Sequence, residues 1–176
     1  LKKSVDRILD LQNDNQKYTL DLKNFSETLS IQAPTIYDAL PYNGDETNAA
    51  NVNRTPKSDY AGTNRLHEAP KAFDSDGTTQ RAGTFYYTTV PGAEVPQRQQ
   101  DDTDASIWST TFTPNATGFK FVSGSALTTT TNASKSGIKI TFQTDQAAND
   151  AGDIYTNRFT AISPTLNGGN QLLTSN

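Results

Sequence analysis

The sequence predicts a mainly β fold, in which an antiparallel β-sandwich or barrel-like C-terminal part follows an N-terminal helix and a long irregular arm. Three patterns predict it. Short runs of alternating apolar and polar residues recur after about residue 105, separated by turn-forming residues. Prolines and other turn formers fill the middle of the chain, and a heptad-like spacing of apolar residues occupies its beginning. We therefore expect four segments: a helical oligomerisation segment at 1–33, a polar arm at 34–104, a β-domain at 105–164 and a tail or linker at 165–176.

The first segment carries the heptad-like pattern. We expect its core positions to form an oligomer contact in a coiled coil, with Asn15 fixing the register: Leu1, Ile8, Leu11, Asn15, Tyr18, Leu22, Phe25 and Leu29. A second interpretation stays open, because Tyr18, Leu20 and Leu22 alternate as in a strand, as do Leu29 and Ile31. On that interpretation a helix ends near Leu11, and two short strands follow a turn at 13–15. Pro34 ends either arrangement, since the residue before a proline is pushed out of helical geometry.

The second segment is dominated by Pro, Asn, Asp, Gly and Thr, and its apolar residues are mostly isolated. One strand is expected at 84–90, a run of β-branched and aromatic residues. So long a stretch with little regular structure is uncommon inside a compact domain. Two interpretations remain open for it: an extended arm that lies across neighbouring subunits, or a large loop excursion on an ordinary β-domain.

The third segment holds the clearest strand signals. We expect strands within 106–113, 118–122, 138–142 and 153–162, bounded by turn-forming pairs such as Ser136-Gly137. Leu127, followed by four threonines, indicates a half-exposed edge strand. The Gly- and Asn-rich stretch after Pro164 is typical of a linker.

Catalytic and metal-binding chemistry is poorly supported by the sequence. His67 is the single histidine and is expected in a loop, where a solvated side chain is the better interpretation than a catalytic base. The carboxylates Asp74 and Asp76 are crowded into one turn instead of facing each other across a cleft. Ala72 and Gly83 occupy positions where a calcium-binding EF-hand needs carboxylates. We therefore expect no catalytic residues, no cofactor and no metal, and a protein that is not an enzyme.

Composition limits the partners. Only 33% of residues are hydrophobic, which leaves little to offset a backbone entropy cost of about 1–2 kcal/mol per ordered residue. We therefore expect neighbouring subunits to contribute to stability. A net charge of −4 with scattered basic residues argues against nucleic acid. No 18-residue apolar run is present, so no membrane span is expected. With no cysteine, disulfides are excluded; with no methionine and Leu1 first, we expect an excerpt or a processed product.

Aromatic residues are the best candidates for a binding surface. Trp108, Tyr86 and Tyr87 are expected on strands, where a flat ring can stack on a sugar. The competing interpretation places Trp108 in the core, as the largest side chain of a small sandwich.

The heptad-like stripe from Leu1 to Leu29 and the polar strand-and-turn series from Trp108 to Ile162 together resemble bacteriophage structural proteins of the fibre, baseplate and capsid-decoration type. The resemblance is one of architecture. It implies a homo-oligomer, with a trimer favoured, that packs against other protein subunits in a virion or on a cell surface. The alternative function is a carbohydrate-binding adhesin or receptor-binding module that contacts a host surface glycan.

Overall fold

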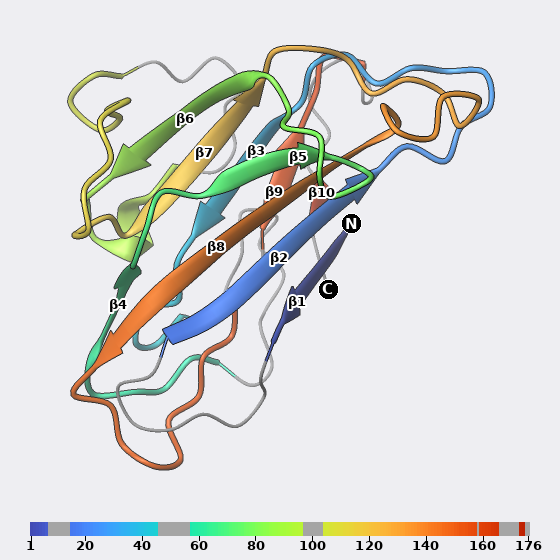
Figure 1. Cartoon of the computed structure of the whole chain (residues 1–176). Helices are drawn as coiled ribbons and strands as arrows, with labels where there is room; N and C mark the ends of the chain where they lie inside the picture. The colour runs from blue at the N-terminus through green and yellow to red at the C-terminus, as the bar shows by residue number, and fades with distance from the viewer. Residues whose placement is uncertain (7–14, 46–56, 97–103, 158, 166–172, 175–176) are drawn as a thin grey trace.

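Two antiparallel five-stranded sheets face each other in a sandwich (Figure 1). The computed structural model describes residues 1–6, 15–45, 57–96, 104–157, 159–165 and 173–174. Sheet I has the order β1-β2-β8-β4, with β5 also paired to β8; sheet II has the order β10-β9-β3-β7-β6. The strands of sheet I are β1 (Lys2–Val5), β2 (Asn15–Lys23), β4 (Thr63–Leu66), β5 (Lys71–Asp74) and β8 (Gly137–Ala147). Those of sheet II are β3 (Thr35–Ala39), β6 (Gly83–Thr88), β7 (Gly118–Ser123), β9 (Thr160–Ile162) and β10 (Leu173–Thr174), and a 3-10 turn, η1 (Gly92–Glu94), follows β6.

The long strand β8 organises sheet I. One of its edges pairs with β2 over nine residues, and its other edge pairs with β5 and then β4. Its sequence alternates apolar Ile138, Ile140 and Phe142 with polar Lys139 and Thr141, and burial follows the same alternation. Since successive side chains of a strand point to opposite faces, this strand presents an apolar row to the core and a polar row to solvent.

The main core fills the space between the sheets. Leu20 and Ile140 from sheet I and Ile36, Phe119 and Phe121 from sheet II are at most 1% exposed. A second apolar cluster lies on the other face of sheet II, where residues 90–95 and 107–108 pack over the strands. It consists of Tyr37, Ala39, Val95, Trp108 and Ile162. Sheet I has no such cover over its outer face among the described residues, so that face is exposed.

Buried ion pairs complete this core and explain how a weakly hydrophobic chain fills a sandwich. Lys3, on the edge strand β1, points inward and forms an ion pair with Asp38 of β3. The side chains are 5% and 0% exposed, and the Lys3 ammonium also lies about 5 Å from the ring of Tyr18. An inward-pointing charge on an edge strand opposes the pairing of that edge with another chain.

The expected N-terminal helix is wrong for the described residues, because β1 and β2 occupy residues 2–5 and 15–23. Tyr18, Leu20 and Leu22 pair with Phe142, Ile140 and Ile138 of β8, all on the core face. The segment therefore follows the strand pattern and not the heptad, because pairing with β8 places the apolar face of β2 in the core. Of the expected oligomer contacts, Tyr18 and Leu22 lie in this core, Leu1 packs half-buried against it, and Asn15 begins β2. Ile8 and Leu11 lie outside the described residues.

The expected arm at 34–104 is also wrong as far as it is described. It contributes β3 and β6 to sheet II and β4 and β5 to sheet I. Short strands here have few apolar residues because their inward positions are filled partly by polar groups such as Asp38, Asn64 and Asp74, all at most 1% exposed. The expected segment boundaries do not coincide with the sheets, since both sheets combine strands from different segments.

The strands expected at 84–90, 118–122 and 138–142 are confirmed as β6, β7 and β8, with small differences at their ends. The strand expected at 106–113 is wrong: a turn and an isolated bridge between Ser109 and Tyr87 replace it. At 153–162 only β9 and a bridge at Ile154 form. Leu127 makes one bridge with Ile31 in place of an edge strand. The expected linker contains β10, which pairs with β9.

Candidate functional site

Two loops project together from one corner of the sandwich (Figure 1). The first, residues 24–31, is the larger part of the connection from β2 to β3; the second, residues 124–136, joins β7 to β8. We call the pair the finger. Backbone hydrogen bonds connect the loops at several points along their length: Ile31 and Leu127 bond reciprocally (2.9 and 2.8 Å), the Thr130 amide donates to Ser26 (3.0 Å), and the Asn24 amide donates to Ser136 (2.8 Å). The two loops therefore behave as one ordered projection.

Asn24 holds the finger from inside. Its side-chain amide nitrogen donates to the Leu29 carbonyl at 2.7 Å and to the Thr128 carbonyl at 3.0 Å, and its oxygen accepts from the Ser26 amide at 3.0 Å. The residue is 5% exposed. All its side-chain bonds go to backbone groups, so Asn24 fixes the course of the first loop and its distance from the second.

The first loop of the finger displays two large apolar side chains. Phe25 is 79% exposed and Leu29 is 71% exposed, the highest values among the described large hydrophobic residues. The next is Ile154, at 39%. Single exposed apolar residues are common on protein surfaces. Two of them four residues apart, on a loop whose backbone is held by hydrogen bonds, are more consistent with a contact site. Both were expected in a coiled coil; the structure places them instead on this loop.

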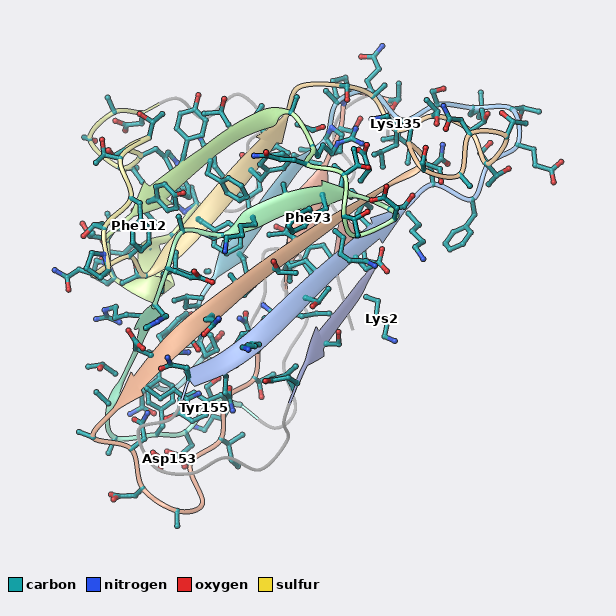
Figure 2. The ribbon with its side chains drawn as sticks, viewed as in Figure 1. Lys2, Phe73, Phe112, Lys135, Asp153 and Tyr155 are labelled. Carbon is teal, nitrogen blue, oxygen red and sulfur yellow. The ribbon has the colours of Figure 1, made fainter. Side chains whose placement is uncertain are left out.

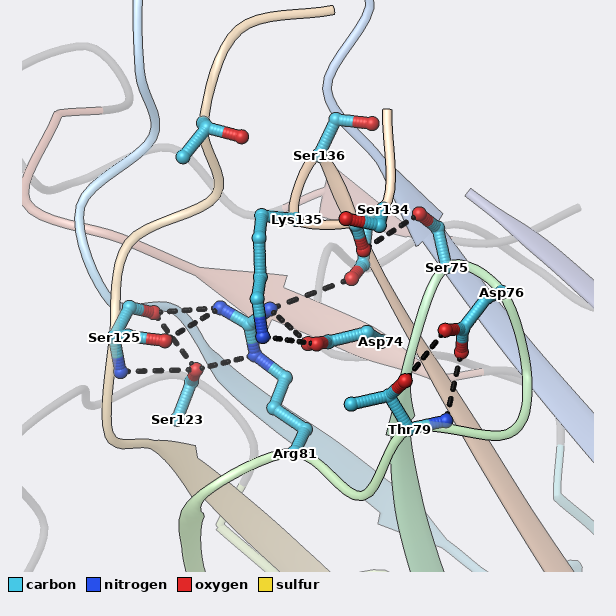
Figure 3. Close-up of polar contacts among 12 residues, drawn as sticks. Asp74, Ser75, Asp76, Thr79, Arg81, Ser123, Ser125, Ser134, Lys135 and Ser136 are labelled. Atoms are coloured by element: carbon cyan, nitrogen blue, oxygen red, sulfur yellow. Dashed lines mark hydrogen bonds and ion pairs between the residues drawn. The ribbon is translucent and has the colours of Figure 1, made fainter. Parts of the chain in front are cut away.

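A buried arginine anchors the base of the second loop (Figure 3). The Arg81 guanidinium is 1% exposed and pairs with Asp74 at 3.0 Å. It also donates to Ser123 Oγ (3.0 Å), to the carbonyls of Ser125 (2.8 Å) and Ala126 (3.0 Å), and to the carbonyl of Gly137 (3.4 Å). Burial lowers the pKa of Arg81, and the charge of Asp74 opposes that effect. One side chain therefore binds both ends of the second loop and the end of β5.

The turn after β5 adds further contacts to the same base. Lys135 of the finger forms an ion pair with Asp74, and the Ser75 amide donates to the Ser134 carbonyl at 3.1 Å. Figure 2 shows Lys135 at this end of the molecule and Asp153 and Tyr155 at the opposite end. Arg81 gave no sequence signal beyond a lone charge in a polar stretch. Asp74 lies seven residues away, but its other partners, at 123–137, are more than forty residues away, and only the fold brings them to the guanidinium.

The acidic turn, which loosely resembled a calcium loop, is occupied by internal hydrogen bonds. Asp74 is paired as above. Asp76 accepts from the Thr79 hydroxyl (2.6 Å) and from the amides of Thr78 (2.8 Å) and Thr79 (2.9 Å). These bonds lower the pKa of Asp76 to about 2. Among the described residues, no three or more His, Asp or Glu side chains gather as a metal site would require.

His67, the one candidate base, lies on the surface. Its Nδ1 is 2.7 Å from Asp145 Oδ1, and the two side chains are 44% and 46% exposed. A triad also needs a nucleophile hydrogen-bonded to the imidazole. In the described part of the chain, the Asp145 carboxylate is the only hydrogen-bond partner of that ring. The geometry is that of an exposed His–Asp pair.

The three aromatic residues expected at a glycan site do not offer their rings to solvent together. Tyr87 belongs to the core between the sheets and is 5% exposed. Trp108 is 4% exposed under the segment that covers sheet II. The buried Lys120 ammonium lies 4.6 Å from the ring centroid of Trp108 and 4.9 Å from that of Tyr86, an arrangement that stabilises a buried cation. Tyr86 is half-buried, so the three rings do not form one exposed stacking surface.

Comparison of the chain with protein-family models, with curated proteins and with solved structures gave no match. Within the described residues, no helix is both long enough and apolar enough to cross a membrane.

Proposed function

We propose that this protein is a non-enzymatic structural subunit of a virion or cell-surface assembly, and that its finger docks on neighbouring subunits, the first partner being a second copy of the chain. The observation that carries the proposal is the exposure of Phe25 and Leu29 on a finger held by Asn24 and Arg81. The polar strand-and-turn series from Trp108 to Ile162, the part of the resemblance to phage structural proteins that does not depend on an N-terminal helix, favours the same role.

The energetics favour weak, repeated contacts. Burying a Leu or Phe side chain fully contributes about 1.5–3 kcal/mol. Because the finger backbone is already ordered, docking would cost little further loop entropy. Two side chains form a small contact, so association between two free copies should be weak. It would become strong where several copies are held side by side, because linked contacts raise the effective concentration.

A second copy is the favoured partner because the finger can be its own complement. Fingers from symmetry-related copies can bring Phe25 and Leu29 together around a rotation axis, which needs no separate apolar pocket. The same geometry allows a dimer or the trimer that the architecture favours. The edge strand β1, with its inward Lys3, is a poor alternative for self-association.

Analytical ultracentrifugation over a concentration series tests the proposal. The wild-type chain should self-associate at high concentration, and the double variant Phe25→Ser/Leu29→Ser should remain monomeric. Ile154→Ser, at the opposite end, is the matched control and should associate like the wild type. A wild-type chain that stays monomeric throughout, or a double variant that associates equally well, would show that the finger is not a self-docking element.

A further inference from the structure

The outer face of sheet I has a regular arrangement of side chains that does not involve the finger. Cross-strand partners project to the same face, so the register places Ser4, Thr19 and Thr141 in one row across β1, β2 and β8. A neighbouring row contains Lys2, Asp21 and Lys139, on β1, β2 and β8, so the Asp21 carboxylate lies between the two lysines. The row on the other side contains longer side chains as well, among them Lys17 and Gln143. Short hydroxyl side chains thus form the floor of a trough between two ridges.

The dimensions of the trough follow from the sheet. Strands lie about 4.8 Å apart, and rows on one face lie about 7 Å apart. The floor therefore extends roughly 10 Å across three strands. A hollow of about 370 Å³ lies over it; its polar lining consists of Ser4, Thr19 and Thr141 together with Asp6, Lys17, Gln143 and Glu68. That volume is at the small end of the range of ligand sites, about 300–1,000 Å³.

Around the trough, several lysines lack an ion-pair partner among the described residues, whereas the neighbouring carboxylates of Asp21 and Glu68 each have one. Among the described residues, the ammonium groups of Lys2, Lys17 and Lys139 have no ion-pair partner. The neighbouring carboxylates are already engaged: Asp21 lies 3.6 Å from Lys23, and Glu68 lies 3.6 Å from Lys71.

Asp6, at the end of the trough, accepts a hydrogen bond from the Lys17 backbone amide at 3.0 Å. A protein of net charge −4 thus presents unpaired positive groups beside a row of hydroxyls. Positive groups next to neutral donors and acceptors match a ligand that carries both carboxylates and hydroxyls.

We propose that this trough binds an acidic oligosaccharide of the uronic-acid type, lying across the strands of sheet I. The hydroxyls of Ser4, Thr19 and Thr141 would exchange hydrogen bonds with sugar hydroxyls, and Lys17 would contact a sugar carboxylate. Nucleic acid is a poorer match, because its bases stack on exposed aromatic rings and the trough floor has none. A protein partner would normally need a buried apolar anchor at its centre.

Binding of oligogalacturonate, a uronic-acid oligomer, tests the proposal, with a malto-oligosaccharide of equal length as the neutral comparison. Two-dimensional NMR of the full chain should show shifts at Ser4, Thr19 and Thr141 with the acidic oligomer and none with the neutral one. Thr19→Val and Thr141→Val keep the shape and β-propensity but remove one hydroxyl each. A net hydrogen bond contributes about 1 kcal/mol, which corresponds to roughly fivefold weaker binding for each variant.

Lys17→Gln should weaken binding further and reduce its salt dependence, whereas Lys57→Gln, an exposed lysine outside the trough, should leave it unchanged. Circular dichroism confirms that each variant is folded. Absence of shifts at the trough, equal binding of both oligomers, or full binding by the Thr19→Val/Thr141→Val double variant would each overturn the proposal. None of these outcomes bears on self-association, because Phe25 and Leu29 are unchanged in every variant.

Discussion

Replacing Arg81 by Met should be among the most destabilising single changes in the described chain. The side chain is 1% exposed, and its partner Asp74 is 2% exposed. Removing one member of a buried ion pair typically costs about 3–5 kcal/mol, because the other charge stays buried without its partner. Lys135 remains beside Asp74 and compensates in part, so we expect the lower end of that range, about 3 kcal/mol.

Urea unfolding followed by the fluorescence of the single tryptophan measures this loss. Trp108 is buried, so its emission should shift when the chain unfolds. With a slope of about 1–3 kcal/mol per molar urea, a loss of 3 kcal/mol lowers the midpoint by roughly 1–3 M. Lys135→Met is the control. Its side chain is 48% exposed, and exposed ion pairs contribute at most about 1 kcal/mol.

The finger should also loosen locally. Arg81 binds the carbonyls of Ser125, Ala126 and Gly137, so amide exchange in residues 124–136 should rise more than exchange in β8. If Arg81→Met costs less than about 1 kcal/mol, or no more than Lys135→Met, the buried pair does not anchor the finger as described.

Four further predictions each concern one side chain. Thr144→Val should raise the free energy of unfolding by about 1 kcal/mol, since the buried Thr144 hydroxyl has no hydrogen-bond partner. The Thr117 hydroxyl donates to the backbone carbonyls of Thr88 and Val90, so Thr117→Val should lower the free energy of unfolding by a similar amount. Urea unfolding that shows the same change for both threonine variants would contradict this. Asp76, with its pKa lowered to about 2, stabilises the fold above the unfolded pKa of about 4. That contribution disappears as pH falls toward 2. The urea midpoints of wild type and Asp76→Asn should therefore differ at pH 7 and converge near pH 2. An NMR titration in which the Asp76 carboxyl has its midpoint near pH 4 would contradict this. Burial raises the pKa of Tyr60 from 10.0 to about 12, so its contribution is complete below pH 10 and is lost as pH rises toward 12. In a spectrophotometric titration, the wild type should therefore show phenolate absorbance near pH 12 that Tyr60→Phe lacks, whereas the absorbance of the two proteins near pH 10 should be the same.

Strands could be predicted from the sequence where local pattern and tertiary environment agree. Ile138–Phe142 alternates in both sequence and burial, and Gly118–Val122 alternates in sequence although both of its faces are covered, so the pattern was sufficient. At Tyr18–Leu22 two periodicities competed, and only the neighbouring strand β8 decided between them. At 106–113 the apolar residues are real core residues, but they reach the core from a turn, which carries no periodicity.

The candidate sites were harder to predict than the strands. Phe25 and Leu29 were singled out as contact residues, although the expected setting, a coiled coil, was wrong. The trough on sheet I depends on the register of β1 and β2 against β8, which follows β2 by more than a hundred residues. Registers are set by which hydrophobic faces meet and by turn geometry, and neither is visible in one strand alone.

By itself, the sequence determined that this protein is mainly β, because alternation and turn chemistry are local properties of the chain. It also indicated the poverty of catalytic groups, since a single histidine and the absence of cysteine are facts of composition. Only the tertiary structure decided how a chain with so few apolar residues closes a core. Asp38 and Arg81 are indistinguishable from surface charges in the sequence. They became interior residues because folding brings Lys3 of β1 to Asp38, and brings Asp74 and the carbonyls at 125–137 to Arg81.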